Sequence, residues 1–530
     1  MKKIVHFGLL IVLLIISSCH THHDTAANEA PVSTDTVPVQ SPDTTSLAVI
    51  DTIPEIPEET VTPIIPFPDT IFPSAEALLF VIDTFETEIS GFLNDLTDKY
   101  DGNDGIYTFR GSLTRNPNFF GTIHSDTLDI HTEWVFATAF DYTKTSHGSW
   151  GGGTGWTGQP LYVHWPDSLQ EIIIGSLCGN VYFLDFETGE PSRECFDSRN
   201  VLKGTPSFDP SMNGNLYIGH GVEKQAPFGN AVYNMLSGKE THTFGKDPKA
   251  WRQWGAYDSS PVVIDSFLFR PGENGTLYKY YIGNGEYLLH STLRYSTSQI
   301  HHSPGIESSM AVCRNYGYLT DNMGNIICVN LNTLKPVWRY FNIDDTDATP
   351  LVDVEDGIPF VYSGCEIDKQ GLTGASHFVK LNGLTGELVW KDTIQGKQVN
   401  IDGKTLNGGM FGSPMLGSKD CSDLIFSNFC INSKAKGYLV AINKADGSVA
   451  YRTKTRQYAW SSPIPFFNER DEMFIFTADC NGYVYLIKGK TGEIVASKKI
   501  GSNFESSPIV VDDKIILGSR GNKIYKIALE

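Results

Sequence analysis

The sequence predicts an all-β protein, an eight-bladed β-propeller in which an N-terminal strand completes the last blade. Three observations support this prediction: a repeated phrase, a repeated opening of each unit, and a strand that is missing at one end of the array and spare at the other. The clearest copy of the phrase is residues 380–390, KLNGLTGELVW, where the turn Thr385-Gly386-Glu387 separates two apolar stretches. A phrase that recurs about every 45 to 60 residues indicates an array of similar units.

The units share both the phrase and an opening. Good copies of the phrase lie at 328–338 (CVNLNTLKPVW), 441–451 (AINKADGSVAY) and 486–496 (LIKGKTGEIVA), and weaker ones at 183–193 and 232–242. Each unit opens at a polar residue that is usually followed by proline; the openings are Gln159, Thr205, Ser260, Ser309, Thr349, Ser413, Ser462 and Ser507. Short strands rich in Val, Ile, Tyr and Phe follow each opening, with turns that contain Gly, Asp and Asn, which predicts four-stranded blades.

The last unit lacks its fourth strand. After Ser507 the sequence shows strands near 509–511, 514–517 and 523–527, and then the chain stops. Residues 132–136 (TEWVF) form a strand with its aromatic residue but have no opening before them. We therefore expect this segment to complete the last blade, which leaves no open edge in the ring.

The first residues predict a lipid anchor. Lys2 and Lys3 precede the apolar residues 7–16, a run too short to span a bilayer. Ile16-Ser17-Ser18-Cys19 resembles the lipobox of bacterial lipoproteins, which implies that 1–18 is a signal peptide and that Cys19 is acylated. The alternative is an ordinary secretory signal. Residue 20 is not Asp, and by analogy with envelope sorting we expect the outer membrane.

Two segments are expected between the anchor and the propeller. Residues 19–74 are rich in Pro and Thr and poor in aromatic residues, and this composition predicts a disordered tether. Over 75–98 the apolar residues fall at a spacing typical of a helix with an acidic outer face. The propeller itself is expected over 107–530.

Composition excludes some functions and leaves others open. The formal net charge is −20, and no basic cluster follows the first residues, so we expect no nucleic-acid partner. Eight cysteines follow Cys19 in an oxidising compartment. Local disulfides, such as Cys421 with Cys430 or Cys178 with Cys195, and free buried thiols are both open alternatives.

The repeated phrase resembles the Ala-x-Asp-x-x-Thr-Gly-x-x-x-Trp motif of PQQ-like β-propeller repeats, the fold of quinoprotein alcohol dehydrogenases. Residues 328–338 and 380–390 match it well, and Phe109-Arg110-Gly111 with Asn116 resembles the segment that leads into that fold. The resemblance covers about 107–530. It implies a structural role for Trp134, Trp338 and Trp390, each packed between neighbouring blades. It also implies two functions: oxidation of alcohols or aldehydes with pyrroloquinoline quinone and Ca²⁺, or a propeller without cofactor that binds proteins.

In such propellers the segments before the innermost strands line one mouth of the central channel. Aligned on their openings, the blades place carboxylate and aromatic residues there: Trp156, Tyr257, Asp258, Glu307, Asp347, Phe411, Trp460, Phe504 and Glu505. Carboxylates could hold Ca²⁺ and aromatic rings could sandwich a flat ligand. Alternatively the acids cap turns and the rings fill the channel. Against an enzyme, the chain has no adjacent cysteine pair, no Cys-x-x-Cys-His and no hydrolase motif.

Two further motifs are typical of surface loops and not of catalytic or metal sites. The glycine-rich residues 148–158 lack the Gly-Lys-Ser/Thr of a phosphate loop, and His301-His302 lacks further ligands at metal spacing. We therefore expect no resident metal or cofactor and no catalytic residue. The predicted function is a non-catalytic scaffold in the outer membrane that binds an envelope protein or a saccharide through its loop faces. The alternative is the quinone- and Ca²⁺-dependent dehydrogenase.

Overall fold

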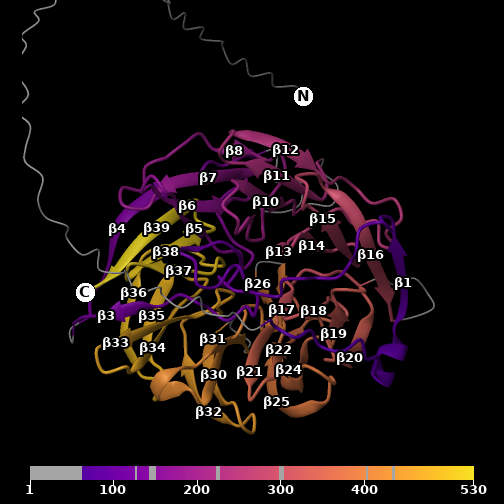
Figure 1. Ribbon diagram of the computed structural model, residues 1–530. Helices are drawn as coiled ribbons and strands as arrows, with labels where there is room; N and C mark the ends of the chain where they lie inside the picture. Colours follow the sequence, from indigo (N-terminus) through magenta and orange to yellow (C-terminus); the bar gives the residue numbers. More distant parts are fainter. Residues whose placement is uncertain are drawn as a thin grey trace, which may run out of the picture. The chain divides into compact units, whose positions relative to one another are not determined.

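A computed structural model describes residues 63–125, 128–142, 151–221, 227–297, 304–401, 404–431 and 436–530, which form one compact unit. The predicted signal peptide, Cys19 and most of the predicted tether lie outside these residues. Eight antiparallel sheets stand in a ring around a central axis (Figure 1), so the predicted eight-bladed propeller is confirmed. Within the described residues, no helix has the length and apolar character to cross a membrane.

The first four blades follow one another in chain order, each running outward from its inner strand. Blade 1 contains β5 (Leu161–His164), β6 (Gln170–Gly175), β7 (Asn180–Asp185) and β8 (Phe196–Asp197). Blade 2 contains β9 (Ser207–Phe208), β10 (Asn215–Gly219), β11 (Asn230–Asn234) and β12 (Lys239–Thr243). Blade 3 contains β13 (Val262–Ile264), β14 (Phe267–Gly272), β15 (Thr276–Tyr281) and β16 (Leu288–Ser296). Blade 4 contains β17 (Ala311–Cys313), β18 (Tyr316–Thr320), β19 (Asn325–Asn330) and β20 (Pro336–Phe341).

The later blades carry insertions. Blade 5 contains β21 (Leu351–Glu355), β22 (Ile358–Gly364), β24 (Thr373–Asn382) and β25 (Leu388–Lys397). Blade 6 contains β29 (Met415–Leu416), β30 (Leu424–Cys430), β31 (Gly437–Asn443) and β32 (Val449–Lys454), with η3 (Lys419–Cys421) between β29 and β30. It is extended by β23 (Glu366–Ile367) and β28 (Gly408–Gly409), and β26 (Val399–Ile401) pairs with β27 (Lys404–Leu406) in a separate hairpin. Blade 7 contains β33 (Ile464–Asn468), β34 (Met473–Ala478), β35 (Tyr483–Lys488) and β36 (Ile494–Lys499).

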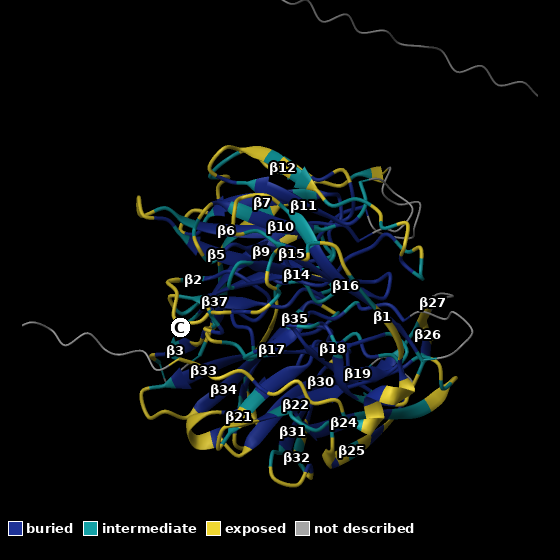
Figure 2. Cartoon of the chain, turned by 45° about the vertical axis from the view of Figure 1, so that its right-hand side comes forward, coloured by how far each residue is buried: buried dark blue, intermediate teal, exposed yellow. Residues whose placement is uncertain are grey.

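Blade 8 is closed by the N-terminal strand, as the sequence predicts. Strands β37 (Ile509–Val511), β38 (Lys514–Ser519) and β39 (Lys523–Leu529) come from the C-terminus. Strand β4 (Ile130–Ala137) pairs antiparallel with β39 and supplies the fourth strand. The buried strands lie inside the ring and the exposed residues gather at its rim (Figure 2). Closure therefore joins the two ends of the array without an exposed edge at the seam.

The predicted helix over 75–98 is wrong. This segment begins with the last residues of a 3-10 turn, η1 (Pro73–Ala77), and continues as strand β1 (Leu79–Thr84), which pairs antiparallel with β16 as a fifth strand of blade 3. Over so short a stretch the apolar spacing suits either structure. The segment forms a strand because the backbone groups at the outer edge of β16 then find hydrogen-bond partners in β1.

The prediction of disorder is also wrong for the C-terminal end of the tether. Residues 63–74 pack on blade 4, where the buried Phe67 ring lies 4.9 Å from the ring of Tyr316. The amide of Asn315 holds the Phe67 backbone at both ends: its Oδ1 accepts from Phe67 N at 2.6 Å and its Nδ2 donates to Phe67 O at 3.1 Å. Such paired contacts order a segment whose composition alone predicts disorder.

The segment that leads into the propeller crosses the central channel. Strand β2 (Gly105–Ile106) pairs with β5 of blade 1, and β3 (Gly121–Ile123) runs parallel to β33 of blade 7. Between them the backbone carbonyls of Tyr107, Leu113 and Thr114 accept hydrogen bonds from the inner strands of blades 2, 4 and 5. Figure 1 shows this indigo and violet chain in the middle of the ring. It blocks the channel and forms the floor of the site described below.

The blade openings connect neighbouring blades. The backbone N–H of Ser260 donates to the hydroxyl of Ser309 at 2.9 Å, and that of Ser309 donates to the hydroxyl of Thr349 at 3.0 Å. Ser413 and Ser462 make the equivalent contacts to the next openings. The Ser and Thr residues are therefore needed as acceptors between blades, which explains why the openings repeat.

The three tryptophans of the repeated phrase lie between blades. The indole N–H of Trp338 donates to Gly383 O at 2.9 Å, that of Trp390 to Lys444 O at 2.8 Å, and that of Trp134 to Phe186 O at 3.0 Å. In each case the acceptor belongs to the Thr-Gly or Asp-Gly turn of the following blade. Gly386 of that turn, at φ +75°, leaves no room for a side chain beside the Trp338 ring.

The cysteines are free thiols. All eight that follow Cys19 are described, and none of them forms a disulfide. The alternative of local disulfides between Cys421 and Cys430 or between Cys178 and Cys195 is therefore wrong.

Candidate functional site

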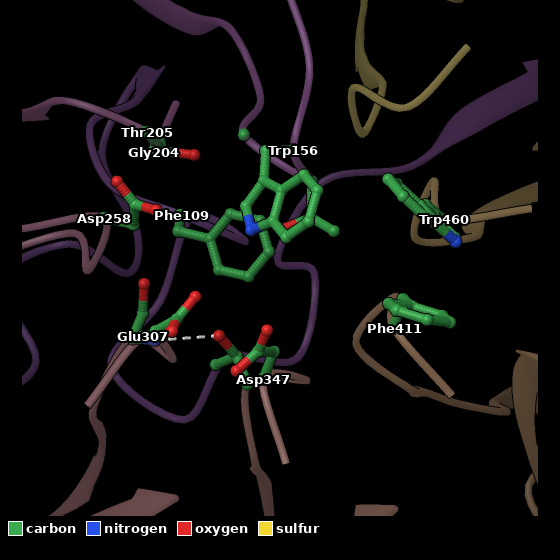
Figure 3. Close-up of a pocket in the computed structure, with 13 residues that line it drawn as sticks. Phe109, Trp156, Gly204, Thr205, Asp258, Glu307, Asp347, Phe411 and Trp460 are labelled. Carbon is green, nitrogen blue, oxygen red and sulfur yellow. Dashed lines mark hydrogen bonds between the residues drawn. The ribbon is translucent and has the colours of Figure 1, made fainter. Parts of the chain in front are cut away.

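A pocket lies on the central axis, above the segment that blocks the channel (Figure 3). Phe109 from that segment lines it together with residues from the loops that precede the inner strands. The full lining is Phe109, Trp156, Thr157, Gly158, Gly204, Thr205, Asp258, Glu307, Ser309, Asp347, Thr349, Phe411 and Trp460. Loops before the inner strands of blades 1 to 7 thus contribute, which is where the sequence predicted a mouth of mixed acids and rings.

Six of the nine predicted mouth residues meet in this pocket: Trp156, Asp258, Glu307, Asp347, Phe411 and Trp460. They divide into an acidic side and an aromatic side (Figure 3). Consecutive blades supply each side, because Asp258, Glu307 and Asp347 precede the inner strands of blades 3, 4 and 5, while Phe411 and Trp460 precede those of blades 6 and 7. The two sides are therefore a consequence of blade order.

The other three predicted residues do not line the pocket. The Tyr257 side chain is buried within blade 3, where its ring lies 4.5 Å below the guanidinium of Arg270. Phe504 packs in the blade core against Tyr525 at 5.7 Å. Glu505 forms an ion pair with Arg520 at 3.0 Å. Adjacent residues in an extended chain point to opposite sides, so a rule based on spacing alone selects neighbours that face away.

The aromatic side is a packed group of rings. The rings of Phe411 and Trp460 stack at 4.8 Å, and Trp156 meets Trp460 edge-on at 5.1 Å. Tyr458 adds a further ring 5.5 Å from Trp460. Trp156 holds a left-handed backbone at φ 59°, a conformation that costs a side-chain-bearing residue about 1 kcal/mol or more. Phe411 thus covers one face of Trp460, and Trp156 and Tyr458 contact the same Trp460 ring.

The acidic side extends behind the pocket to residues that the sequence analysis missed. Asp258 pairs with Lys203, whose Nζ also lies 3.9 Å from Glu273. Carboxylate oxygens of Asp258, Glu273 and Glu307 lie within 4.8 Å of one another. Glu273 follows β14 and not a blade opening, so the alignment that selected Asp258 and Glu307 could not select it.

A second acidic group adjoins the first. Oxygens of Asp345, Asp347 and Glu366 likewise lie within 4.8 Å of one another, and Lys369 pairs with Asp345 at 2.9 Å. Asp345 stands two residues before the predicted Asp347, and Glu366 belongs to the inserted strand β23. Neither position follows from the repeat, which is why both were missed.

Burial sets the protonation of these acids. Desolvation, reinforced by neighbouring carboxylates, raises the pKa of Asp258 to about 6, of Glu307 to about 7 and of Glu273 to about 8. Desolvation also raises the pKa of Asp347 and Glu366 well above the ordinary carboxyl values. Burial therefore brings the pKa of Asp258, Glu307 and Glu273 close to neutral.

The size of the pocket limits what it can hold. Its cavity measures about 30 Å³, roughly the space of one water molecule or one ion. Sites for flat organic cofactors measure about 300 Å³ or more. The cavity beside Trp156, Phe411 and Trp460 therefore has at most about a tenth of that volume. The carboxylates, by contrast, are the oxygen ligands that Ca²⁺ prefers.

The remaining sequence motifs are only partly visible. Of the glycine-rich residues 148–158, the described part enters blade 1, and only Trp156, Thr157 and Gly158 reach the pocket. His301-His302 lies outside the described residues. Two long loops, residues 363–376 and 395–409, are described apart from two residues of the second, and Leu372 in the first is 77% exposed.

Known sequences resemble only a small part of this chain. No protein-family model matches the chain. The human beta-alanine-activating enzyme is 25% identical over 85 residues, which are 16% of this chain. The chain spans only 8% of the length of that relative.

Comparison with solved structures gives the fold. A quinohemoprotein alcohol dehydrogenase from Pseudomonas putida superposes with a TM-score of 0.57 at 12% identity, over 80% of each chain. A europium-containing methanol dehydrogenase gives 0.56 at 12% identity, over 80% of this chain and 98% of that one. BamB from Moraxella catarrhalis gives 0.47 at 14% identity, over 76% of this chain and 100% of that one. The chain therefore has the propeller fold that the repeated phrase predicts.

Proposed function

We propose that the protein is a non-catalytic scaffold of the bacterial cell envelope, anchored in the outer membrane by acylated Cys19, whose propeller binds another envelope protein. The observation that supports this most directly is the packed aromatic side of the axial pocket. Phe411 stacks on Trp460 and Trp156 meets Trp460 edge-on, and the cavity beside them has room for about one water molecule. A fold relative that oxidised alcohols would need that space for its quinone.

The proposed binding surface is the inserted region around blades 5 and 6. Strands β26 and β27 form a hairpin outside the blade sheets and lie at the margin of the molecule in Figure 2. Gln398 N, next to the hairpin, donates to Leu372 O at 3.1 Å and so joins it to the exposed loop of Leu372. Loops that project from a rigid scaffold suit protein binding.

The first test is a titration with the cofactor. The full chain in detergent, freed of metal and then given Ca²⁺, is titrated with pyrroloquinoline quinone while quinone absorbance and Trp fluorescence are followed. We expect no saturable change up to high micromolar quinone. Saturable, Ca²⁺-dependent binding would refute the non-catalytic role.

The second test addresses the scaffold. A photo-crosslinking residue is placed at Leu372, and a matched one at Phe341, which is 54% exposed on β20. In native cells we expect a discrete adduct from position 372 and none from position 341. The Cys19→Ala variant should leave the outer-membrane fraction and lose that adduct. Equal labelling at both positions would contradict the proposed surface.

A second candidate is the quinone- and Ca²⁺-dependent dehydrogenase. The observation that favours it is the buried acidic side, where desolvation holds the pKa of Glu307 at about 7, close to the value that suits a general base. It requires the three rings to move apart. The cofactor titration distinguishes the two candidates.

A further inference from the structure

The second acidic group joins two parts of the chain that the repeat does not connect. Asp345 and Asp347 stand in the loop between β20 and β21, and Glu366 lies in the inserted strand β23. The backbone fixes their relation, because Glu366 N donates to Asp345 O at 2.7 Å. One carboxylate oxygen from each of the three lies within 4.8 Å of the other two.

Each of these side chains also keeps a buried oxygen without a partner. Glu366 is 2% exposed; its Oε2 accepts from Asn407 Nδ2 at 3.1 Å, whereas its Oε1 accepts no hydrogen bond from the part of the chain that the structure describes. Asp345 Oδ1 and Asp347 Oδ1 are likewise buried and accept none among the described residues. A buried carboxylate oxygen without a partner is costly, so one on each of three neighbouring acids indicates a missing ligand of positive charge.

The charges around the group do not balance. Lys369 pairs with Asp345 at 2.9 Å and with Asp368 at 3.7 Å, so it is shared between two acids. Glu307 of the neighbouring acidic group adds a fourth acidic side chain close by. On the other side of Glu307, Lys203 is already engaged by Asp258 and Glu273.

We propose that Asp345, Asp347 and Glu366 bind one divalent cation of the kind that prefers oxygen ligands, Ca²⁺ above all, without any organic cofactor. Three carboxylates and solvent supply the hard oxygen ligands that such an ion takes. Asp347 also lines the axial pocket, whose volume of about 30 Å³ gives water and ions a way in. The ion ties the inserted strand β23 to the loop before blade 5 and so stabilises the insertion. This inference does not rest on the scaffold role.

The test is calorimetric titration of the full chain in detergent, stripped of metal with a chelator and then titrated with Ca²⁺. We expect one ion per chain. Glu366→Gln keeps the shape of the side chain and its bond to Asn407 but removes its charge, and it should weaken binding by about tenfold or more. Glu273→Gln, the matched change in the other acidic group, should leave the affinity within about threefold.

A thermal readout keeps the test independent of how well one variant folds. Ca²⁺ should raise the unfolding temperature of the wild type and of Glu273→Gln, and at the same concentration it should raise that of Glu366→Gln, and of a second variant, Asp345→Asn, clearly less. No saturable heat up to about 1 mM Ca²⁺ would overturn the proposal. Binding that survives Glu366→Gln and Asp345→Asn but is lost in Glu273→Gln would also overturn it, because the ion would then lie in the other group.

Discussion

Removal of the Trp338 ring should weaken the propeller far more than removal of an aromatic ring from the same strand that faces solvent. Trp338 is fully buried, packs 6.0 Å from the Tyr318 ring and donates to Gly383 O of the next blade. Replacement of a buried Trp by Ala costs about 3 to 5 kcal/mol, and the lost hydrogen bond brings the sum to about 4 to 6 kcal/mol. Phe341→Ala, in the same strand at 54% exposure, should cost less than about 1 kcal/mol.

The assay is thermal unfolding followed by circular dichroism at one fixed scan rate. A propeller of roughly 420 residues unfolds with an entropy of about 0.9 kcal/mol per degree, so Trp338→Ala should lower the unfolding temperature by about 5 °C. Phe341→Ala should lower it by about 1 °C or less. If the two variants unfold within a degree of each other, the tryptophan does not hold neighbouring blades together, and the packing argument fails.

Three further predictions concern titration, the N-terminal segment and the thiols. Burial raises the pKa of Asp258 to about 6, of Glu307 to about 7 and of Glu273 to about 8. The folded state therefore retains protons that the unfolded chain releases near pH 4. In EDTA, the unfolding temperature should fall as the pH rises from 5 to 8. A rise over this range would contradict the raised pKa values of these three acids. Phe67→Ala should expose residues 63–84 to limited proteolysis while the blades stay protected, and an unchanged digestion pattern would show that the segment is held elsewhere. Cys195, the exposed thiol, should react first with Ellman's reagent in native protein, the buried thiols should need denaturant, and non-reducing mass measurement should find no disulfide.

Much of the architecture could be predicted from the sequence because the repeat encodes it locally. The turn at Gly386, the ring of Trp338 and the opening at Ser309 each perform the same task in every blade in which they recur, so their spacing reports the blade. The missing strand after 523–527 and the spare strand at 132–136 likewise predicted the closure of blade 8 by β4. These features depend on residues close together in the chain and on periodicity, which a sequence shows directly.

Only the tertiary structure decided the rest. Strand β1 forms where a helix was predicted, because the unpaired edge of β16 supplies hydrogen bonds that no local pattern can reveal. Glu366 and Glu273 join the acidic site from positions outside the repeat, whereas Tyr257 leaves it by facing the blade core. The chain by itself thus determined a ring of eight blades with acids and rings at one mouth. Packing between segments far apart in sequence decided which of those side chains converge and how little space they leave.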